Sequence, residues 1–469
     1  YMAVVHFPLE EEALLVDEVV VSASRNEVSR RDAPVVVNVL SPILFETVNS
    51  TDLAKSLNFQ SGLRVENNCQ NCGFPQVRIN GLDGPYSQIL INSRPIISAL
   101  GGVYGLEQIP TNMIDRVEVV RGGGSALFGA NAVGGTINIV TNTIDAKRGG
   151  SVSYGVGNDG ANTMSVSLST GLMDNGWAAS LLLAKRWGDG YIQGTGYEGY
   201  NWFVNVSKRI NSNHQLSLTA FGAPQKHNQR KPLYAGLSIE EWDKVAKWTG
   251  EKNKYRYNAV YGFDNNGKER SSMTNEYHKP QISLNHQWQI DRKSSLSTAL
   301  YMSIGRGSGY SGQGRTSADR AMWNGSSNGK LLTNFRKSDG TFDYGAIQDM
   351  NAASLDGSRM VMSKSLNNHM WYGLLSTYTN ELLPGLELSA GVDVRYYVGE
   401  HTNEIIDLYD GAYFIDDADR KNVKPENNIA AADPNWKYEK LSVGDIVYRD
   451  YDGHVHQEGV FAQLEYSKN

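Results

Sequence analysis

The feature that most constrains this fold is a two-residue period in the sequence after Thr141. Apolar and polar residues alternate in several segments, for example 281–290, 386–396 and 460–466. Alternation of this kind puts one set of side chains on each face of a β-strand. The segments have about the 9–11 residues that a tilted strand needs to cross a bilayer. The pattern therefore predicts strands with one face toward lipid and the other toward a polar interior.

The connections between these segments are of two kinds. Tight turns lie at 173–176, 210–213, 290–293 and 383–385, and long connections cover 223–277, 305–367 and 399–456. Short turns at one end and long loops at the other are the expected asymmetry of outer-membrane barrels. A soluble β-sandwich is the alternative, but three loops of this length would be unusual in one. We expect an antiparallel transmembrane β-barrel.

The number of strands sets the size of that barrel. About ten strands can be counted from near Gly150 onward. A lumen closed by ten strands would be too small for a separate domain, whereas barrels plugged by one have about 22 strands. We therefore expect that the chain holds the N-terminal part of a barrel of about 22 strands. The C-terminal half of that barrel is expected to be absent from this sequence.

Composition narrows the classes of function. The net charge of −6 and the isoelectric point near 5.9 argue against a nucleic-acid-binding protein with a basic face. No apolar run reaches about 18 residues, so no transmembrane helix is expected. A mean hydropathy of −0.42 is compatible with a barrel, because its alternating strands do not raise the average. The 48 glycines and 25 tyrosines suit the turns and aromatic girdles of such a barrel.

The region from Asp17 to about Thr141 has a different texture, with short elements of mixed type. The expected elements are a short helix at 51–57 and strands at 35–40, 76–81 and 87–92. Residues 82–85 have the composition of a turn between the last two strands. With roughly 125 residues, the region has an ordinary domain size. The sequence predicts a compact α+β domain here.

The end of this domain is the most distinctive stretch of the chain. Residues 114–121 alternate as a strand, 122–124 form a glycine turn, and 134–141 lead into a second strand. Glycine permits positive φ and close approach of the backbone. A phosphate-binding loop is the competing interpretation, but no Gly-Lys-Ser/Thr follows. The run closely resembles the end of the plug domain in TonB-dependent outer-membrane transporters.

The resemblance implies an α+β plug domain inside an antiparallel transmembrane β-barrel. It divides the chain into a remnant of a carboxypeptidase-regulatory-like domain with its linker at 1–16, a TonB box at 17–23, the plug at 24–147 and the N-terminal part of the barrel with long extracellular loops at 148–469. A β-prone segment such as the TonB box can add as a strand to the edge of a partner's sheet. An ordinary edge strand is the alternative. The residues expected to bind TonB are Asp17, Glu18, Val19, Val20, Val21, Ser22 and Ala23.

Three charged residues are expected to anchor the plug. The segment 77–81 is similar to the family's Ile-Arg-Gly motif, with Asn80 inserted, and 118–122 matches a second Arg-Gly motif that begins at Glu118. By resemblance, Arg78 and Arg121 would pair with barrel glutamates, which we expect beyond residue 469. An Arg–carboxylate pair is geometrically specific, whereas a buried arginine without a partner is costly. The alternative is that both arginines are solvated strand ends.

Cys69 and Cys72 are the two cysteines of the sequence. One Cys-x-x-Cys supplies two of the four ligands of a structural zinc, and no second pair follows. No metal site and no cofactor are therefore expected. A local disulfide is the interpretation that we favour, and contact with a ligand or a metal is the alternative.

Plug loops and external loops form the substrate pocket in the family. The candidates for ligand contact are Cys69, Cys72, Phe74, Tyr86 and Tyr104 in the plug and His227, Trp242 and Tyr310 in the external loops. Aromatic side chains suit haem, corrin or catecholate chelates, although they are also common in barrel girdles. His454 and His456 could ligate a metal or haem iron, but such a pair on one strand face is more often incidental.

The function implied by the resemblance is energised import of a scarce nutrient across the outer membrane of a Gram-negative bacterium, without catalysis. The expected substrate is an iron chelate, either a ferric siderophore or haem. Cobalamin is the next alternative, followed by a glycan or peptide delivered with a surface lipoprotein. TonB with its inner-membrane energising complex and outer-membrane lipid or lipopolysaccharide are the expected partners, and nucleic acid is not. The rival classes are a non-transporting adhesin or barrel and an outer-membrane enzyme, for which no catalytic set has supportive spacing.

Overall fold

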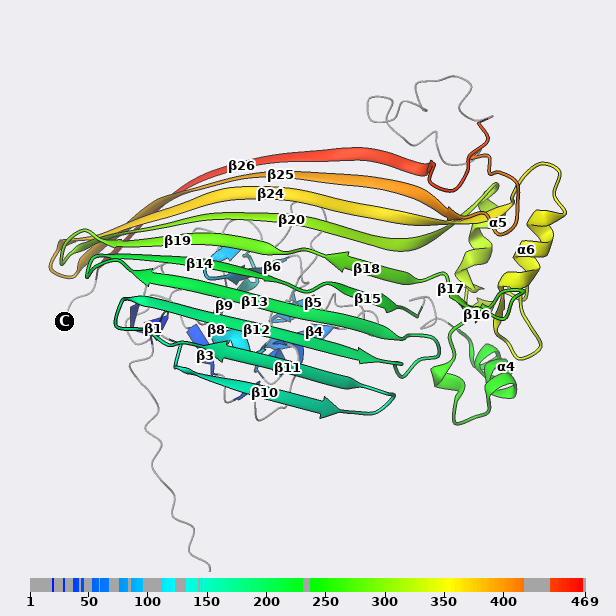
Figure 1. The fold of residues 1–469 in the computed structure, drawn as a ribbon, viewed down its shortest axis with the longest axis horizontal. Helices are drawn as coiled ribbons and strands as arrows, with labels where there is room; N and C mark the ends of the chain where they lie inside the picture. The colour runs from blue at the N-terminus through cyan, green and yellow to red at the C-terminus, as the bar shows by residue number, and fades with distance from the viewer. Residues whose placement is uncertain are drawn as a thin grey trace, which may run out of the picture.

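The computed structural model describes residues 19–20, 28–29, 37–41, 44–45, 53–58, 60–66, 76–82, 86–95, 111–122, 132–141, 144, 146–230, 237–416 and 439–466. In this part of the chain a small domain, the plug, lies against one face of a long curved sheet, the wall (Figure 1). Several residues singled out from the sequence lie outside the described residues: Asp17, Glu18, Val21, Ser22, Ala23, Cys69, Cys72, Phe74 and Tyr104.

A five-stranded sheet with the order β3-β8-β9-β6-β7 forms the centre of the plug. Strands β8 and β9 pair antiparallel, as the glycine turn between them predicts, and β6 pairs parallel with β9. The predicted strands and the short helix of this region are confirmed. The plug elements are β1 (Val19–Val20), β2 (Val28–Ser29), β3 (Val37–Leu40), α2 (Leu53–Leu57), β4 (Leu63–Glu66), β5 (Gln76–Ile79), β6 (Ser87–Ile91), β7 (Arg94–Pro95), η3 (Thr111–Met113), β8 (Ile114–Arg121) and β9 (Gly135–Thr141).

The wall follows an up-and-down order in which each strand pairs antiparallel with the next. Ten strands lie on this path in the described residues, which agrees with the predicted number, and β15 and β18 extend the sheet beside it. The wall strands are β10 (Gly149–Val156), β11 (Asn162–Ser169), β12 (Trp177–Gly188), β13 (Tyr197–Arg209), β14 (His214–Gly222), β15 (Gln225–Asn228), β18 (Thr274–His278), β19 (Gln281–Gln289), β20 (Ser294–Gly314), β24 (Met360–Leu383), β25 (Leu386–Asp407) and β26 (Ile446–Tyr466).

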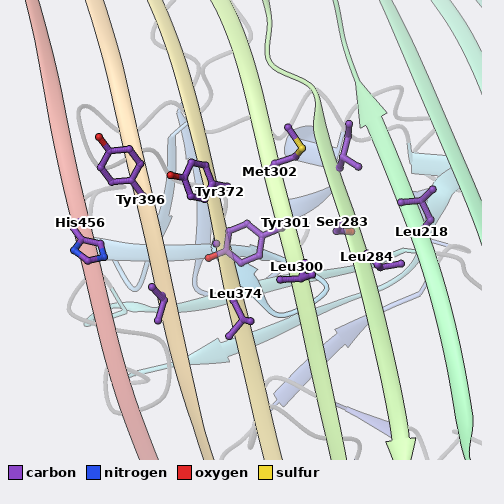
Figure 2. Close-up of a pocket in the computed structure, with 13 residues that line it drawn as sticks. Leu218, Ser283, Leu284, Leu300, Tyr301, Met302, Tyr372, Leu374, Tyr396 and His456 are labelled. Atoms are coloured by element: carbon purple, nitrogen blue, oxygen red, sulfur yellow. The ribbon is translucent and has the colours of Figure 1, made fainter.

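The two faces of the wall differ as the two-residue period predicts. On β19, Ile282 and Leu284 are about 40 % exposed, whereas Ser283 between them is 2 % exposed. Ser283 is on the inner face, the one that contacts the plug. Figure 2 shows the outer face, with Met302, Tyr372 and Tyr396 in front of the strands and the plug behind them. The apolar groove seen there has a volume of about 760 Å³.

The plug is held to the wall by a shared hydrophobic core, here called the apolar seam. Leu182 on β12, Phe203 on β13 and Phe221 on β14 are all buried and are neighbours across the sheet. They belong to the same cluster as the plug's own core, which includes Val117 and Ile137. Burying one such side chain contributes about 1.5–3 kcal/mol. The apolar seam therefore fixes one side of the plug to β12–β14.

The strands at the long-loop end differ from the prediction, since β20, β24, β25 and β26 continue well into the segments assigned to connections. The long connections are correspondingly shorter, at 315–359 and 408–445. These extensions carry no regular apolar–polar alternation, so the sequence pattern stops while the strand pairing continues. Glycine is frequent there for a steric reason: a Cβ on Gly312 would lie 2.2 Å from the Trp323 ring.

The long connections are folded rather than irregular, and we call them the loop layer. Their helices α4, α5 and α6 gather beyond one end of the strands (Figure 1). The elements are α4 (Ile239–Thr249), η5 (Lys254–Arg256), β16 (Tyr261–Phe263), β17 (Glu269–Ser271), α5 (Ser317–Ala321), η6 (Met322–Asn324), β21 (Ser326–Ser327), β22 (Lys330–Leu331), β23 (Phe342–Asp343) and α6 (Tyr344–Ala352). Among the described residues, no helix has the length and apolarity to span a membrane.

Candidate functional site

The inner face of β24, β25 and β26 carries basic and aromatic side chains toward the long-loop end. We call this set the basic–aromatic strip, and it consists of Trp371, Arg395, Tyr397, His401, Arg449 and Tyr451. The Arg395 guanidinium lies 5.5 Å from the centroid of the Trp371 ring, and the His401 and Tyr451 rings stack with their centroids 4.9 Å apart. Cations and ring faces alternate along the strip, so it can bind an anionic, conjugated ligand.

Two arginines of the strip each have a buried donor nitrogen without a hydrogen-bond partner among the described residues. Arg395 donates to Gln457, and Arg449 donates to Asn367 over 3.2 Å. Among the described residues, neither Nη1 of Arg395 nor Nε of Arg449 has a hydrogen-bond partner. A buried guanidinium nitrogen without an acceptor is unfavourable, and an anionic ligand would supply one.

Tyr86 and His227, two of the predicted ligand residues that the structure describes, are not part of this strip. Tyr86, at the start of β6, is 52 % exposed, and its backbone carbonyl accepts a hydrogen bond from Gly134. His227 on β15 is buried, with its ring edge-on to Tyr277 at 6.1 Å. Among the described residues, Nδ1 of His227 has no hydrogen-bond partner. Ligand contact by Tyr86 and His227 stays a prediction.

Trp242 and Tyr310 lie in the packed interior of the loop layer. Trp242 packs against the cluster that contains Val245 and Tyr257. Tyr310, on β20, packs against the cluster that contains Trp323. Both rings thus have a packing role that the sequence did not suggest. Ligand contact by Trp242 and Tyr310 stays a prediction.

Buried polar groups stabilise the loop layer. Burial raises the pKa of Tyr257 to about 12, and its hydroxyl donates to the carbonyl of Gly340 over 2.8 Å. Burial of Asp264 acts to raise the pKa of its carboxyl group. Hydrogen bonds from the Lys268 backbone and the Arg270 guanidinium act in the opposite direction and together outweigh burial, so the pKa of Asp264 is lowered. These contacts hold together the described parts of the loop layer beyond one end of the strands (Figure 1).

Two of the residues expected to anchor the plug, Glu118 and Arg121, make hydrogen bonds within the plug. Glu118 is fully buried and accepts a hydrogen bond from Nε of Arg116 over 2.8 Å. Arg121 is exposed and donates to Oγ of Ser61 over 3.0 Å. Arg78 is half-buried on β5. Pairing of Arg78 and Arg121 with barrel glutamates stays a prediction.

Val19 and Val20 are the described members of the segment expected to bind TonB. They form β1, which pairs antiparallel with β2, Val28–Ser29. The pairing shows that this part of the segment adopts strand geometry. Strand geometry is what addition to the edge of another sheet requires.

The strip was missed because the sequence cannot show which strands are neighbours. Its signal was nevertheless present, since Arg395 and Tyr397 continue the inward positions of the alternating segment 386–396. A guanidinium at an inward position of a barrel strand is a candidate ligand contact. Only the pairing of β25 with β24 on one side and β26 on the other brings Arg395 beside Trp371 and Gln457.

Known proteins resemble the chain in both parts. Residues 29–136 match the family model described as the TonB-dependent receptor plug domain. A vitamin B12 transporter of Vibrio vulnificus is 29 % identical over 202 residues, covering 42 % of this chain and 33 % of the relative. One of Photobacterium profundum is 26 % identical over 216 residues, covering 44 % and 35 %.

Among solved structures, the ferripyoverdine receptor of Pseudomonas aeruginosa superposes with a TM-score of 0.63 at 13 % identity, covering 95 % of this chain and 51 % of that one. The siderophore receptor PiuA of Acinetobacter baumannii gives 0.59 at 15 % identity, covering 97 % and 58 %. At such identities the likeness concerns the fold. The chain spans about a third of the length of the two vitamin B12 transporters.

Proposed function

Since the chain carries the plug domain of the TonB-dependent receptors together with strands of their barrel fold, we propose that it acts in an outer-membrane transporter that imports a nutrient with energy delivered through TonB. The observation that carries the proposal is the apolar seam, in which Leu182, Phe203 and Phe221 of the wall share one core with the plug. A plug packed onto the inner face of a barrel wall can block a passage and can also be moved. An adhesin or an enzyme has no need of this arrangement.

The outer face of the wall supports the location in a membrane. Its apolar groove is lined by exposed side chains from β14, β19, β20, β24 and β25, among them Leu218, Ile282, Leu300, Met302 and Tyr372 (Figure 2). A large exposed apolar surface on a barrel wall is stable in contact with lipid chains rather than with water. Outer-membrane lipid is accordingly the proposed partner of this face.

The substrate that the basic–aromatic strip fits best is an anionic iron chelate, such as a ferric siderophore. The guanidinium groups of Arg395 and Arg449 can donate to its oxygens, and the rings of Trp371 and Tyr451 can contact its conjugated parts. Haem has the same combination of carboxylates and a conjugated plane. Two solved structures of the same fold are named as a ferripyoverdine receptor and a siderophore receptor, which agrees with this choice.

Cobalamin is the second candidate, favoured by the names of the two curated relatives. It is a bulky conjugated ligand that would use the rings of the strip more than its charges. The two candidates therefore make different demands on Arg395. Loss of the guanidinium should weaken a carboxylated or catecholate chelate strongly and cobalamin weakly.

The segment from Asp17 to Ala23 is the proposed TonB contact. Its described residues, Val19 and Val20, pair as a strand with Val28 and Ser29. Exchange of this short pairing for the edge of a TonB sheet would link TonB to the plug. Force applied there acts on the plug through the chain between β2 and β3.

The test is growth of a deletion strain on single nutrients, with the full-length protein supplied from a plasmid. We expect rescue on one class of ferric chelate, haem or cobalamin, and loss of rescue when residues 17–23 are deleted. Arg395→Ala should weaken binding of an anionic chelate by about tenfold or more, the usual effect of losing a charged hydrogen bond. Tyr372→Ala, on the outer face, is the matched control. Rescue that does not depend on 17–23 would contradict the proposal, and rescue on a glycan or peptide alone would replace the substrate class.

A further inference from the structure

A polar hollow of about 640 Å³ lies between the plug and the strands β14, β19, β20 and β24. On the plug side it is lined by the turn at Asn92 and Ser93. On the wall side it is lined by neutral hydrogen-bonding side chains such as Asn285, Ser297 and Thr377. This contact between plug and wall is thus unpacked and polar, in contrast to the apolar seam beside it.

The charged residues of the hollow stand at its short-turn end. Arg209 and Glu387 lie next to the tight turns that join β13 to β14 and β24 to β25. Asp115 and Arg116 of the plug form an ion pair of 2.7 Å there. The hollow therefore has a charged mouth at the short-turn end and a neutral interior.

At its other end the hollow stops at Tyr301. Along β20 the inward residues that line the hollow end at Ala299, and Tyr301 is the next inward residue toward the long loops. The Tyr301 ring lies over Gly373 on β24, where an added Cβ would come within 2.5 Å of the ring. Its hydroxyl donates to Asp393 over 3.5 Å.

Arg94 of the plug makes a cation–π contact with the Tyr301 ring. Its guanidinium carbon lies 5.9 Å from the centroid of Tyr301, and the residue is only 4 % exposed. Within the described residues, its Nε and Nη2 atoms have no hydrogen-bond partner. Burial lowers its pKa to about 10, although Tyr301 acts in the opposite direction. Such a cation gains hydration when it moves away, so the contact is closed but easily opened.

We infer that the polar hollow is the route by which the substrate passes the plug, and that the contact between Arg94 and Tyr301 is its gate. The inference rests on the proposed import function. The plug stays attached to β12–β14 through the apolar seam while its opposite side separates from β20 and β24. A volume of 640 Å³ equals that of roughly twenty waters, so a large chelate can pass only after this separation. The neutral, hydrogen-bonding walls suit a hydrated polar ligand without retaining it by charge.

The gate can be tested without any substrate. Ser297→Cys puts a thiol in the hollow, and Ser180→Cys puts one next to Leu182 at the apolar seam. A bulky, membrane-impermeant maleimide is added outside intact cells that express the full-length protein. The protein with Cys69 and Cys72 alone gives the background.

Opening of the gate should expose the first thiol selectively. Arg94→Ala and Tyr301→Ala should each speed labelling of Ser297→Cys by about tenfold, as expected for loss of a buried cation–π contact. Tyr301→Phe keeps the ring and should label at the original rate. Tyr372→Ala, a tyrosine on the outer face of the next strand, should also leave the rate unchanged.

Three results would overturn the inference. The first is an unchanged rate in both Arg94→Ala and Tyr301→Ala. The second is an equal rise in the labelling rate of Ser180→Cys when Arg94→Ala or Tyr301→Ala is added. The whole plug would then have been loosened or have left the wall. The third is an equal rise in Tyr372→Ala. Since labelling needs no nutrient, failure of the gate and failure of the import function are separate outcomes.

Discussion

The two sides of the plug meet the wall in different ways. At β12–β14, Leu182, Phe203 and Phe221 join the plug core, and the contact is apolar and closely packed. At β19, β20 and β24, the side chains around a hollow of 640 Å³ are mainly serine, threonine, asparagine and glutamine, together with apolar side chains such as Ala299 and Leu375. Apolar packing resists separation, whereas a polar interface exchanges its partners for water at little cost. One sheet thus offers the plug a fixed side and a releasable side.

The difference suggests how a plug can be moved without losing its fold. Force on the segment near Val19 would first open the contact that is weakest. The described contacts point to the side of Ser297 and Thr377 rather than to the apolar seam. A plug that was held equally on all sides would have to unfold or leave entirely.

Phe203→Ala should give the largest loss of stability, because Phe203 is 1 % exposed in the apolar seam. We expect a loss of about 3–5 kcal/mol in the free energy of unfolding. The measurement is denaturant unfolding of the purified full-length protein, with protease protection of the plug as a second readout. Val204→Ala on the outer face of the same strand should lose about 1 kcal/mol or less. Equal losses in both variants would mean that the seam does not hold the plug.

Glu118→Gln should have an intermediate effect, since Glu118 is fully buried beside Arg116. Removing one partner of a buried ion pair is expected to cost about 3 kcal/mol. Amide hydrogen exchange in β8 of the full-length protein measures the effect. Asp115→Asn, at the more exposed partner of Arg116, should cost less than about 1 kcal/mol. A loss confined to the wall strands would instead support the predicted role of Glu118 as an anchor to the barrel.

Thr377→Val should have the smallest effect of the three. Thr377 faces the hollow from β24 and lies outside the apolar seam. The free energy of unfolding should change by about 0.5 kcal/mol or less, the range for sites away from a packed core. Thermal unfolding of Thr377→Val and Phe203→Ala, measured side by side in the full-length protein, compares the two losses of stability directly. A loss as large as that of Phe203→Ala would show that both sides of the plug are equally packed.

The sequence predicted what depends on neighbours along the chain. The alternation at Ile282, Ser283 and Leu284 gave both faces of β19, and the glycine turn gave the β8–β9 pair. The plug domain followed from resemblance to a known family. In these places local pattern and tertiary structure agree.

Contacts between distant residues could not be predicted in this way. Arg94 and Tyr301 are more than 200 positions apart, and neither lies in a motif. The parts of β20 and β24 toward the long loops carry no regular alternation of apolar and polar residues, so the sequence did not predict their pairing. The packing of Trp323 against Phe342 in the core of the loop layer likewise joins residues from different parts of a long connection. These features depend on which strands pair and which loops fold together.

The most direct test of the releasable side is a tether across it. Ser93→Cys and Ser297→Cys line the same hollow from the plug and from the wall, so a cleavable bis-maleimide can join them. In cells with the full-length protein, the tether should reduce uptake of the rescuing nutrient to background, and cleavage should restore it. The control pair Thr298→Cys and Ser376→Cys joins the neighbouring wall strands β20 and β24 on their outer face, away from the hollow, and should leave uptake intact. Normal uptake with the plug tethered to β20 would contradict the account.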